Sequence, residues 1–106
     1  MRVTAISTLE IHLSQGSDVA LEKCLVNFAS QMRSFPGCVA FTLIRSTNLP
    51  TLWILSGYWS SEADMRYHYC AFELQELLAT MQQPSLRLEF GSFVCKTLQE
   101  VGHVAG

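Results

Sequence analysis

Residues 51–68 have the sequence TLWILSGYWSSEADMRYH, and this stretch decides the fold. Its first half, which ends at Trp59, is apolar and rich in residues that favour strands. Ser61 then begins a helix, because a serine hydroxyl accepts a bond from a free backbone N–H and Asp64 completes a capping box. His68 follows inside this helix, about two turns on. Because open sheets tend to hold ligands near such junctions, the segment predicts a pocket wall, with ordinary core packing as the alternative.

The residues before this stretch predict one strand and one helix. Apolar and polar residues alternate from Val3 to Leu13, which is the period of a half-buried strand. A turn at residues 15–18 then leads into an amphipathic helix that ends before Pro36 and Gly37. The apolar stripe of this helix consists of Leu21, Cys24, Leu25, Phe28 and Met32.

The remaining residues predict three strands and a second helical region. Residues 38–44 and 51–59 form two strands of a hairpin, turned by residues 46–50. The helix around His68 is followed by a second helical piece from Cys70 to Met81, with a break near Cys70. A last strand starts at Leu86, bulges at residues 91–92 and resumes at residues 93–98, before a frayed tail at residues 101–106.

The order of these elements is β-α-β-β-α-β, which indicates a ferredoxin-like α+β fold in a single domain, residues 1–106. This fold has a four-stranded antiparallel sheet with helices on one face. Residues 38–44 and 52–59 are apolar on both faces, and helices can cover only one of them. We therefore expect a homodimer in which the sheets of two subunits pack together as a dimeric α/β barrel.

Composition supports burial beyond that of a lone monomer and excludes several functions. Charged residues make up 15% of the 106 residues, against a usual share of about a quarter, and apolar residues reach 49%. The net charge is −2, and the seven Lys and Arg residues are scattered, which argues against nucleic acid as a partner. No apolar run is long enough to span a membrane, and the first residues lack the apolar core of a signal peptide, so we expect a cytoplasmic protein.

The four cysteines do not form a metal-binding pattern. Cys24, Cys38 and Cys95 lie in apolar stretches, where a free cysteine behaves as a small hydrophobe, so we expect core packing. Cys70 is expected at the helix break and more exposed. Phosphate-loop, nucleophile-elbow and coenzyme motifs are absent from the sequence, and we expect no cofactor and no metal.

The chain resembles the antibiotic biosynthesis monooxygenase family of dimeric α/β barrels. The resemblance extends over about residues 3–98. It rests on the order and spacing of Phe35-Pro36-Gly37-Cys38, Trp59, Ser61-x-Ala63, His68, Leu74 and Leu77-Leu78.

This resemblance implies oxygenation of a small aromatic quinol or anthrone by O2 without metal or flavin. His68 would be the catalytic base, since an imidazole titrates near neutral pH. Trp59, Tyr67 and Phe72 would bind the substrate as a pocket wall. His12 lies among polar residues near a strand end, and we expect it to be exposed.

The sequence departs from the family pattern at three positions. Glu73 stands where many members have a second histidine. Leu55 and Met65 stand where related polyketide oxygenases have polar groups around the tryptophan. Two other functions therefore stay open: a ligand-binding or regulatory module without catalysis, and an isomerase that uses His68 as a proton shuttle on a small carbonyl compound.

Overall fold

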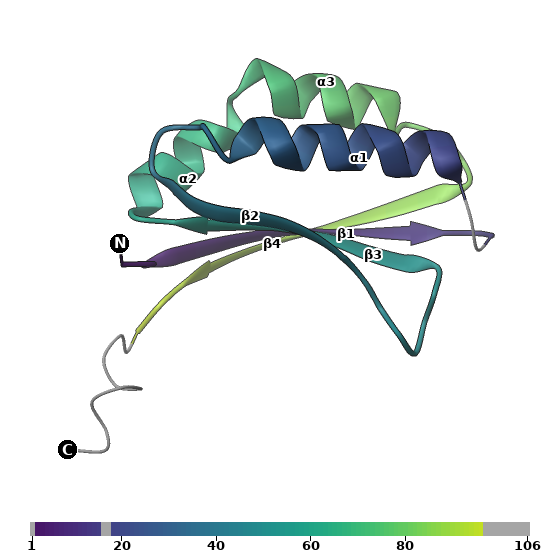
Figure 1. Ribbon diagram of the computed structural model, residues 1–106, viewed down its shortest axis with the longest axis horizontal. Helices are drawn as coiled ribbons and strands as arrows, with labels where there is room; N and C mark the ends of the chain where they lie inside the picture. The colour runs from purple at the N-terminus through teal and green to yellow at the C-terminus, as the bar shows by residue number, and fades with distance from the viewer. Residues whose placement is uncertain (1, 16–17, 97–106) are drawn as a thin grey trace.

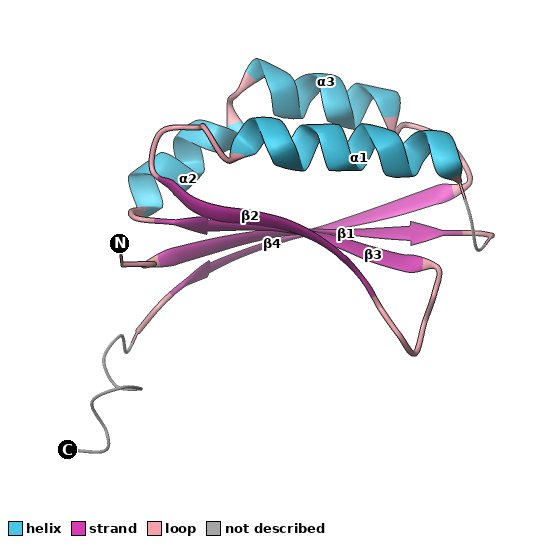
Figure 2. Ribbon diagram, viewed as in Figure 1, coloured by secondary structure: helices cyan, strands magenta, loops and turns pink. Residues whose placement is uncertain are grey.

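The computed structural model describes residues 2–15 and 18–96. Its helices lie together on one face of a single antiparallel sheet (Figures 1 and 2). The strands are arranged in the order β2-β3-β1-β4, as the ferredoxin-like prediction requires. Along the chain the elements are β1 (Ala5–Leu13), α1 (Val19–Met32), β2 (Cys38–Arg45), β3 (Leu52–Trp59), α2 (Glu62–Tyr69), α3 (Phe72–Thr80) and β4 (Leu86–Val94).

β1 is an inner strand, and its predicted alternation is confirmed. Every odd-numbered residue from Ala5 to Leu13 is buried, and every even-numbered one is half-buried. β1 pairs with β3 on one side and with β4 on the other. The odd-numbered residues face the helices, so they supply the central row of the core.

The predicted helix caps are present. Asp18 accepts a hydrogen bond from the Leu21 N–H at 2.9 Å and begins α1. Ser61 accepts one from the Asp64 N–H at 3.0 Å and begins α2, and its hydroxyl donates to the Asp64 carboxylate at 2.8 Å, so the second bond of the predicted capping box comes from the serine hydroxyl instead of the backbone N–H. α2 ends at Tyr69, and the exposed Cys70 lies at the break before α3, as predicted.

Gly37 lets the chain turn from α1 into β2. Its φ is +77°, a region that residues with a side chain rarely adopt, and a Cβ there would collide with the Asp64 carboxyl group. The Ser60 N–H also donates to the Gly37 carbonyl at 2.9 Å. This turn therefore packs directly against the start of α2.

Two predicted details of the strands are wrong. No bulge occurs at residues 91–92, because β4 pairs with β1 in an unbroken register from Leu86 to Val94. The irregularity lies instead in β2, between Cys38 and Ala40. The strand also ends at Val94 rather than at residue 98. Residues 97 and 98 and the tail at residues 101–106 lie outside the described part of the chain.

The three cysteines expected in the core lie at its margin. Cys24, Cys38 and Cys95 are each half-buried, and Cys24 and Cys38 pack against core residues from outside. In α1 the stripe residues Leu21, Leu25, Phe28 and Met32 are buried as expected. The predicted stripe is therefore confirmed at every residue except Cys24.

The second face of the sheet carries no helix in the part of the chain that the structure describes (Figure 2). The register places Ile6, Tyr58 and Phe93 side by side on this open face, and Ile44 beside Ile54. Ile44 and Phe93 are exposed. Among the described helices, none is both long and apolar enough to cross a membrane.

Candidate functional site

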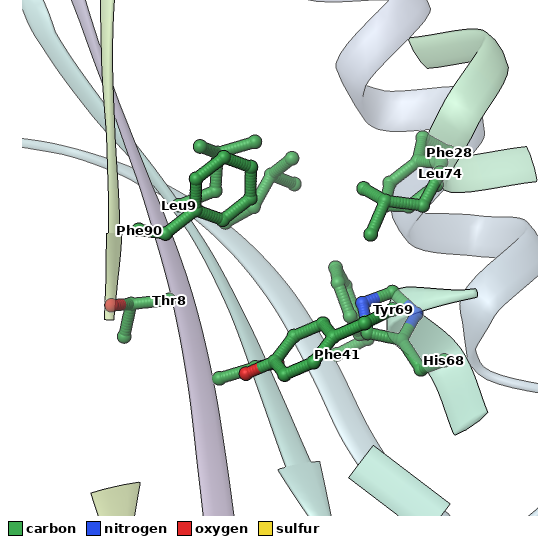
Figure 3. Close-up of a pocket in the computed structure, with 10 residues that line it drawn as sticks. Thr8, Leu9, Phe28, Phe41, His68, Tyr69, Leu74 and Phe90 are labelled. Carbon is green, nitrogen blue, oxygen red and sulfur yellow. The ribbon is translucent and has the colours of Figure 1, made fainter. Parts of the chain in front are cut away.

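A small cavity lies between the sheet and the helices, beside the end of α2 and the first turn of α3. Side chains from the strands and from the helices face each other across it (Figure 3). Its volume is about 20 Å³, which is room for about one water molecule. Its lining residues are Ser7, Thr8, Leu9, Phe28, Phe41, Leu55, His68, Tyr69, Leu74 and Phe90.

His68 is a buried imidazole in the wall of this cavity. It is 3% exposed, and its Nδ1 has no hydrogen-bond partner among the described residues. The ring stacks on the Trp59 indole, with centroids 4.8 Å apart and planes 28° from parallel. Burial among aromatic rings lowers the pKa of His68 from 6.5 to about 4. The ring is therefore neutral at neutral pH.

Trp59 holds both the histidine and a serine on the neighbouring strand. Its indole is fully buried, and the Nε1–H donates to the Ser7 Oγ at 2.9 Å. Phe35 and Phe41 each form a T-shaped contact with the indole. Trp59 is thus a fixed platform behind His68 rather than one of the residues that line the cavity.

The structure places Tyr67 and Phe72 away from this cavity. Their side chains are 61% and 70% exposed, and neither lines it. In α2 the buried residues are Met65 and His68, which are one turn apart, so Tyr67 is turned about 100° away from the buried side. Of the residues expected to form the site, only His68 and Trp59 are brought together.

Two polar residues of the cavity did not follow from the sequence. Tyr69 hydrogen-bonds through its hydroxyl to the Ser92 Oγ of β4, which ties α2 to the edge of the sheet. Ser7 lies in a row of otherwise apolar inward-facing residues of β1 and is buried. In the sequence, a polar residue at an inward-facing position of the first strand could have indicated that Ser7 belongs to the site.

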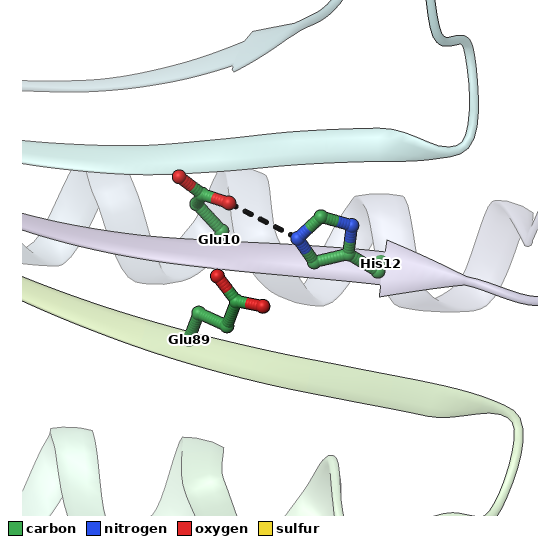
Figure 4. A group of neighbouring side chains, drawn as sticks. All are labelled: Glu10, His12 and Glu89. Carbon is green, nitrogen blue, oxygen red and sulfur yellow. Dashed lines mark hydrogen bonds and ion pairs between the residues drawn. The ribbon is translucent and has the colours of Figure 1, made fainter.

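A second group of titratable side chains lies on the open face of the sheet (Figure 4). One ligand atom from each of Glu10, His12 and Glu89 lies within 4.8 Å of the others. Each member already has a partner: the His12 Nε2 is 3.0 Å from the Glu10 carboxylate, and Glu89 pairs with Arg87. His12 is half-buried rather than exposed as expected. We interpret this group as a hydrogen-bonded pair beside an ion pair.

The fold and the cavity define a small ferredoxin-like domain with a site between sheet and helices. The profile of the antibiotic biosynthesis monooxygenase family matches residues 4–69, well over half of the chain. The chain therefore belongs to this family. A comparison with curated protein sequences finds no match.

Solved structures share the fold at low sequence identity. A Deinococcus radiodurans protein assigned to the antibiotic biosynthesis monooxygenases has a TM-score of 0.81 and 15% identity, over 92% of this chain and 97% of that one. A similarly assigned Caulobacter crescentus protein has a TM-score of 0.71 and 17% identity, over 90% and 92%. SnoaB, a cofactor-independent oxygenase from Streptomyces nogalater, has a TM-score of 0.67 and 16% identity, over 91% and 97%. At these identities the likeness concerns the fold.

Proposed function

We propose that the protein is a cofactor-independent monooxygenase that acts with O2 on a small aromatic quinol or an anthrone-like carbon acid. One observation carries the proposal: a neutral, buried His68 without a hydrogen-bond partner for Nδ1 among the described residues lies in the wall of an apolar cavity. Family membership and the structural similarity to a named cofactor-independent oxygenase support the same chemistry. His68 is the base, and Trp59 holds its ring in place.

Proton transfer to His68 needs help from the rest of the site. A phenol has a pKa of about 10, and burial holds that of His68 at about 4, so the transfer is uphill by about 8 kcal/mol at 1.36 kcal/mol per unit. A bound anion beside the ring offsets much of this difference, because opposite charges favour each other in a site of low dielectric. The reaction therefore requires close contact between the substrate oxygen and the imidazole, and a donor for that oxygen.

The proposed chemistry balances without a further reductant. His68 takes one proton from the substrate, and the resulting anion gives an electron to O2. The substrate radical and superoxide combine to a peroxide anion at carbon, which takes the proton back from His68 and then loses water to leave a ketone. A CH2 group and O2 thus become a C=O group and H2O, with both oxygen atoms accounted for and the substrate as the only reductant.

Access to the site requires side chains at its rim to move. A cavity of about 20 Å³ is too small for an aromatic ring system. Tyr69 and Phe90 stand at the rim, and the hydrogen bond between Tyr69 and Ser92 closes the gap between α2 and β4. Release of this bond lets Tyr69 swing outward, and the cavity then opens along the edge of β4.

The decisive experiment is oxygen uptake with a panel of quinols and anthrones by protein freed of metal and flavin. We expect uptake by the wild type and a loss of at least a hundredfold in His68→Ala, in line with the usual contribution of a general base. His68→Phe keeps the stacking on Trp59 and should be equally inactive. His12→Ala, on the opposite face of the sheet, is the matched control and should keep wild-type activity.

A ligand-binding module is the second candidate, favoured by one apolar residue of the cavity wall and by one buried residue of α2 that does not line the cavity. Leu55 lines it as an apolar side chain, and Met65 beside His68 on α2 is buried. Binding of a quinol without any oxygen uptake would establish this function instead. Turnover of a carbonyl substrate without oxygen consumption would identify an isomerase that uses His68 as a proton shuttle.

The open face of the sheet is proposed to bind a second copy of the chain. Its apolar residues include the exposed Ile44 and Phe93 and the half-buried Ile6, Ile54 and Tyr58. In the register they form two apolar groups separated by Thr42, Ser56 and Thr8, and exposed apolar groups on a small protein are a feature of interfaces. Sheet-on-sheet packing would bury both groups and leave the cavity on the other face of each subunit.

A further inference from the structure

Among the described residues, none accepts the proton of the buried Ser7 hydroxyl. The side chain is 5% exposed and lines the same cavity as His68. An indole N–H can only donate, so the Ser7 oxygen is the acceptor of the bond from Trp59. The Ser7 proton must then point elsewhere, and no protein group within residues 2–15 and 18–96 accepts it.

The contact between Trp59 and Ser7 depends on a gap in the side chains of β3. Gly57 lies directly opposite Ser7 in the register of β1 and β3. A Cβ at Gly57 would lie 2.7 Å from the Ser7 Oγ and 2.7 Å from the Trp59 Nε1. Glycine weakens a strand, and inside one it often marks a close approach of other groups. Here it lets the indole reach across to β1.

The rest of the cavity offers few competing donors. Most lining residues are apolar, and the Tyr69 hydroxyl is already paired with Ser92. A buried hydroxyl that lacks an acceptor is unfavourable, and a ligand oxygen relieves that penalty. The bond from Trp59 also polarises the serine hydroxyl and makes it a stronger donor.

We propose that Ser7 binds the substrate's oxygen atom, donating its hydroxyl proton to the phenolate or enolate that forms when His68 takes the substrate proton. Trp59 is then a positioning residue that fixes Ser7 with its N–H and His68 with its ring face. The inference rests on the proposed function, which it deepens by naming the residue that binds the substrate oxygen. The ligand must be a planar aromatic compound whose oxygen atom carries the developing negative charge.

The test uses 2-naphthol, whose ionised form absorbs at longer wavelength than the neutral form. A pH titration of its absorbance, with protein in excess, gives the pKa of the bound phenol. We expect that pKa to lie below the value in water for the wild type and to rise by about one unit, a tenfold loss of anion binding, in Ser7→Ala. Ser7→Thr keeps a hydroxyl and should restore most of the shift.

Ser56→Ala is the matched control. Ser56 is also 5% exposed, but it lies on β3 opposite Thr8, on the other face of the sheet. Its replacement should leave the pKa of bound naphthol unchanged, and circular dichroism should show that all variants are folded. A bound pKa that is the same in wild type and Ser7→Ala, or no naphthol binding by the wild type, would overturn the role of Ser7.

Oxygen uptake, measured separately, distinguishes this failure from that of the proposed function. If Ser7 controls the ionisation of naphthol but no quinol or anthrone consumes O2, the oxygenase proposal fails and the oxygen-binding role of Ser7 stands. If O2 uptake depends on His68 but is unchanged in Ser7→Ala, the oxygenase proposal stands and the role of Ser7 is wrong.

Discussion

One histidine lies on each side of the sheet, His12 on β1 and His68 on α2, and the two differ in burial and in pairing. His12, on the open face, is half-buried and has the Glu10 carboxylate as a partner at 3.0 Å. His68, on the helix-covered face, is buried against Trp59, and among the described residues its Nδ1 has no partner. A paired group is already satisfied, whereas an unpaired buried group is left free to react with a ligand. The contrast favours the helix-covered face for the proposed site.

The largest effect on this contrast is expected when the Trp59 indole, on which His68 stacks, is removed. Trp59→Ala deletes a fully buried indole that contacts Phe35, Phe41 and His68. We expect the free energy of unfolding to fall by about 3–5 kcal/mol, as for other buried aromatic residues truncated to alanine. Urea denaturation measures the change. Phe72→Ala, an exposed aromatic, is the control and should lose less than about 1 kcal/mol.

The pH dependence of stability tests the burial of His68. Its folded pKa of about 4 is below the unfolded value of 6.5, so the unfolded chain binds more protons between these pH values. Stability from this group is complete above pH 6.5 and falls as the pH drops towards 4. At about pH 5 the loss amounts to about 2 kcal/mol.

His68→Phe removes this pH-dependent contribution. The difference in unfolding free energy between the variant and the wild type should shift by about 2 kcal/mol in favour of the variant from about pH 7.5 to about pH 5. Denaturation curves at the two pH values measure it, and Tyr67→Phe, an exposed neighbour, serves as the control. A difference that stays constant with pH would mean that His68 is solvated in solution.

The sequence predicted those features that depend on neighbouring residues. The alternation of β1 and the bond between Ser61 and Asp64 are set within a few positions of the chain, and both are present. Trp59 and His68 also lie together, because α2 is short and its N-cap sets which residues of the helix face the core. Local pattern was therefore enough to predict these elements and the placement of Trp59 beside His68.

The side chains around His68 could not be predicted in this way. The bond between Ser7 and Trp59 joins residues 52 positions apart and requires the register that sets Ser7 opposite Gly57. The sequence favoured Tyr67 and Phe72 as the pocket wall, but the phase of α2 turns Tyr67 outward and brings Tyr69 to the cavity. Such choices are decided by tertiary packing rather than by local pattern.

A variant on the open face tests the proposed dimer. Phe93 is 54% exposed on this face, beside Ile6. A carboxylate in its place would have to be desolvated at a sheet-on-sheet interface, so Phe93→Asp should raise the dimer dissociation constant at least about tenfold. Phe72→Asp puts the same charge on the helix-covered side and should change nothing. Sedimentation of the wild type as a monomer at all concentrations would refute the dimer.

The smallest effect is expected from the group of charged side chains on the open face. It tests whether these side chains are held by pairing with one another, in contrast to the unpaired surroundings of His68. Glu10 and Glu89 lie directly opposite each other on β1 and β4, and like charges so placed repel. Arg87 offsets this repulsion through its ion pair with Glu89. Because both side chains of that pair are largely exposed, Arg87→Ala should lower the unfolding free energy by only about 0.5 kcal/mol, and less at high salt. Glu89→Gln in the same background should recover the loss by removing the second carboxylate. A loss well above about 1 kcal/mol, insensitive to salt, would show that this group is buried in solution and that the open face is covered.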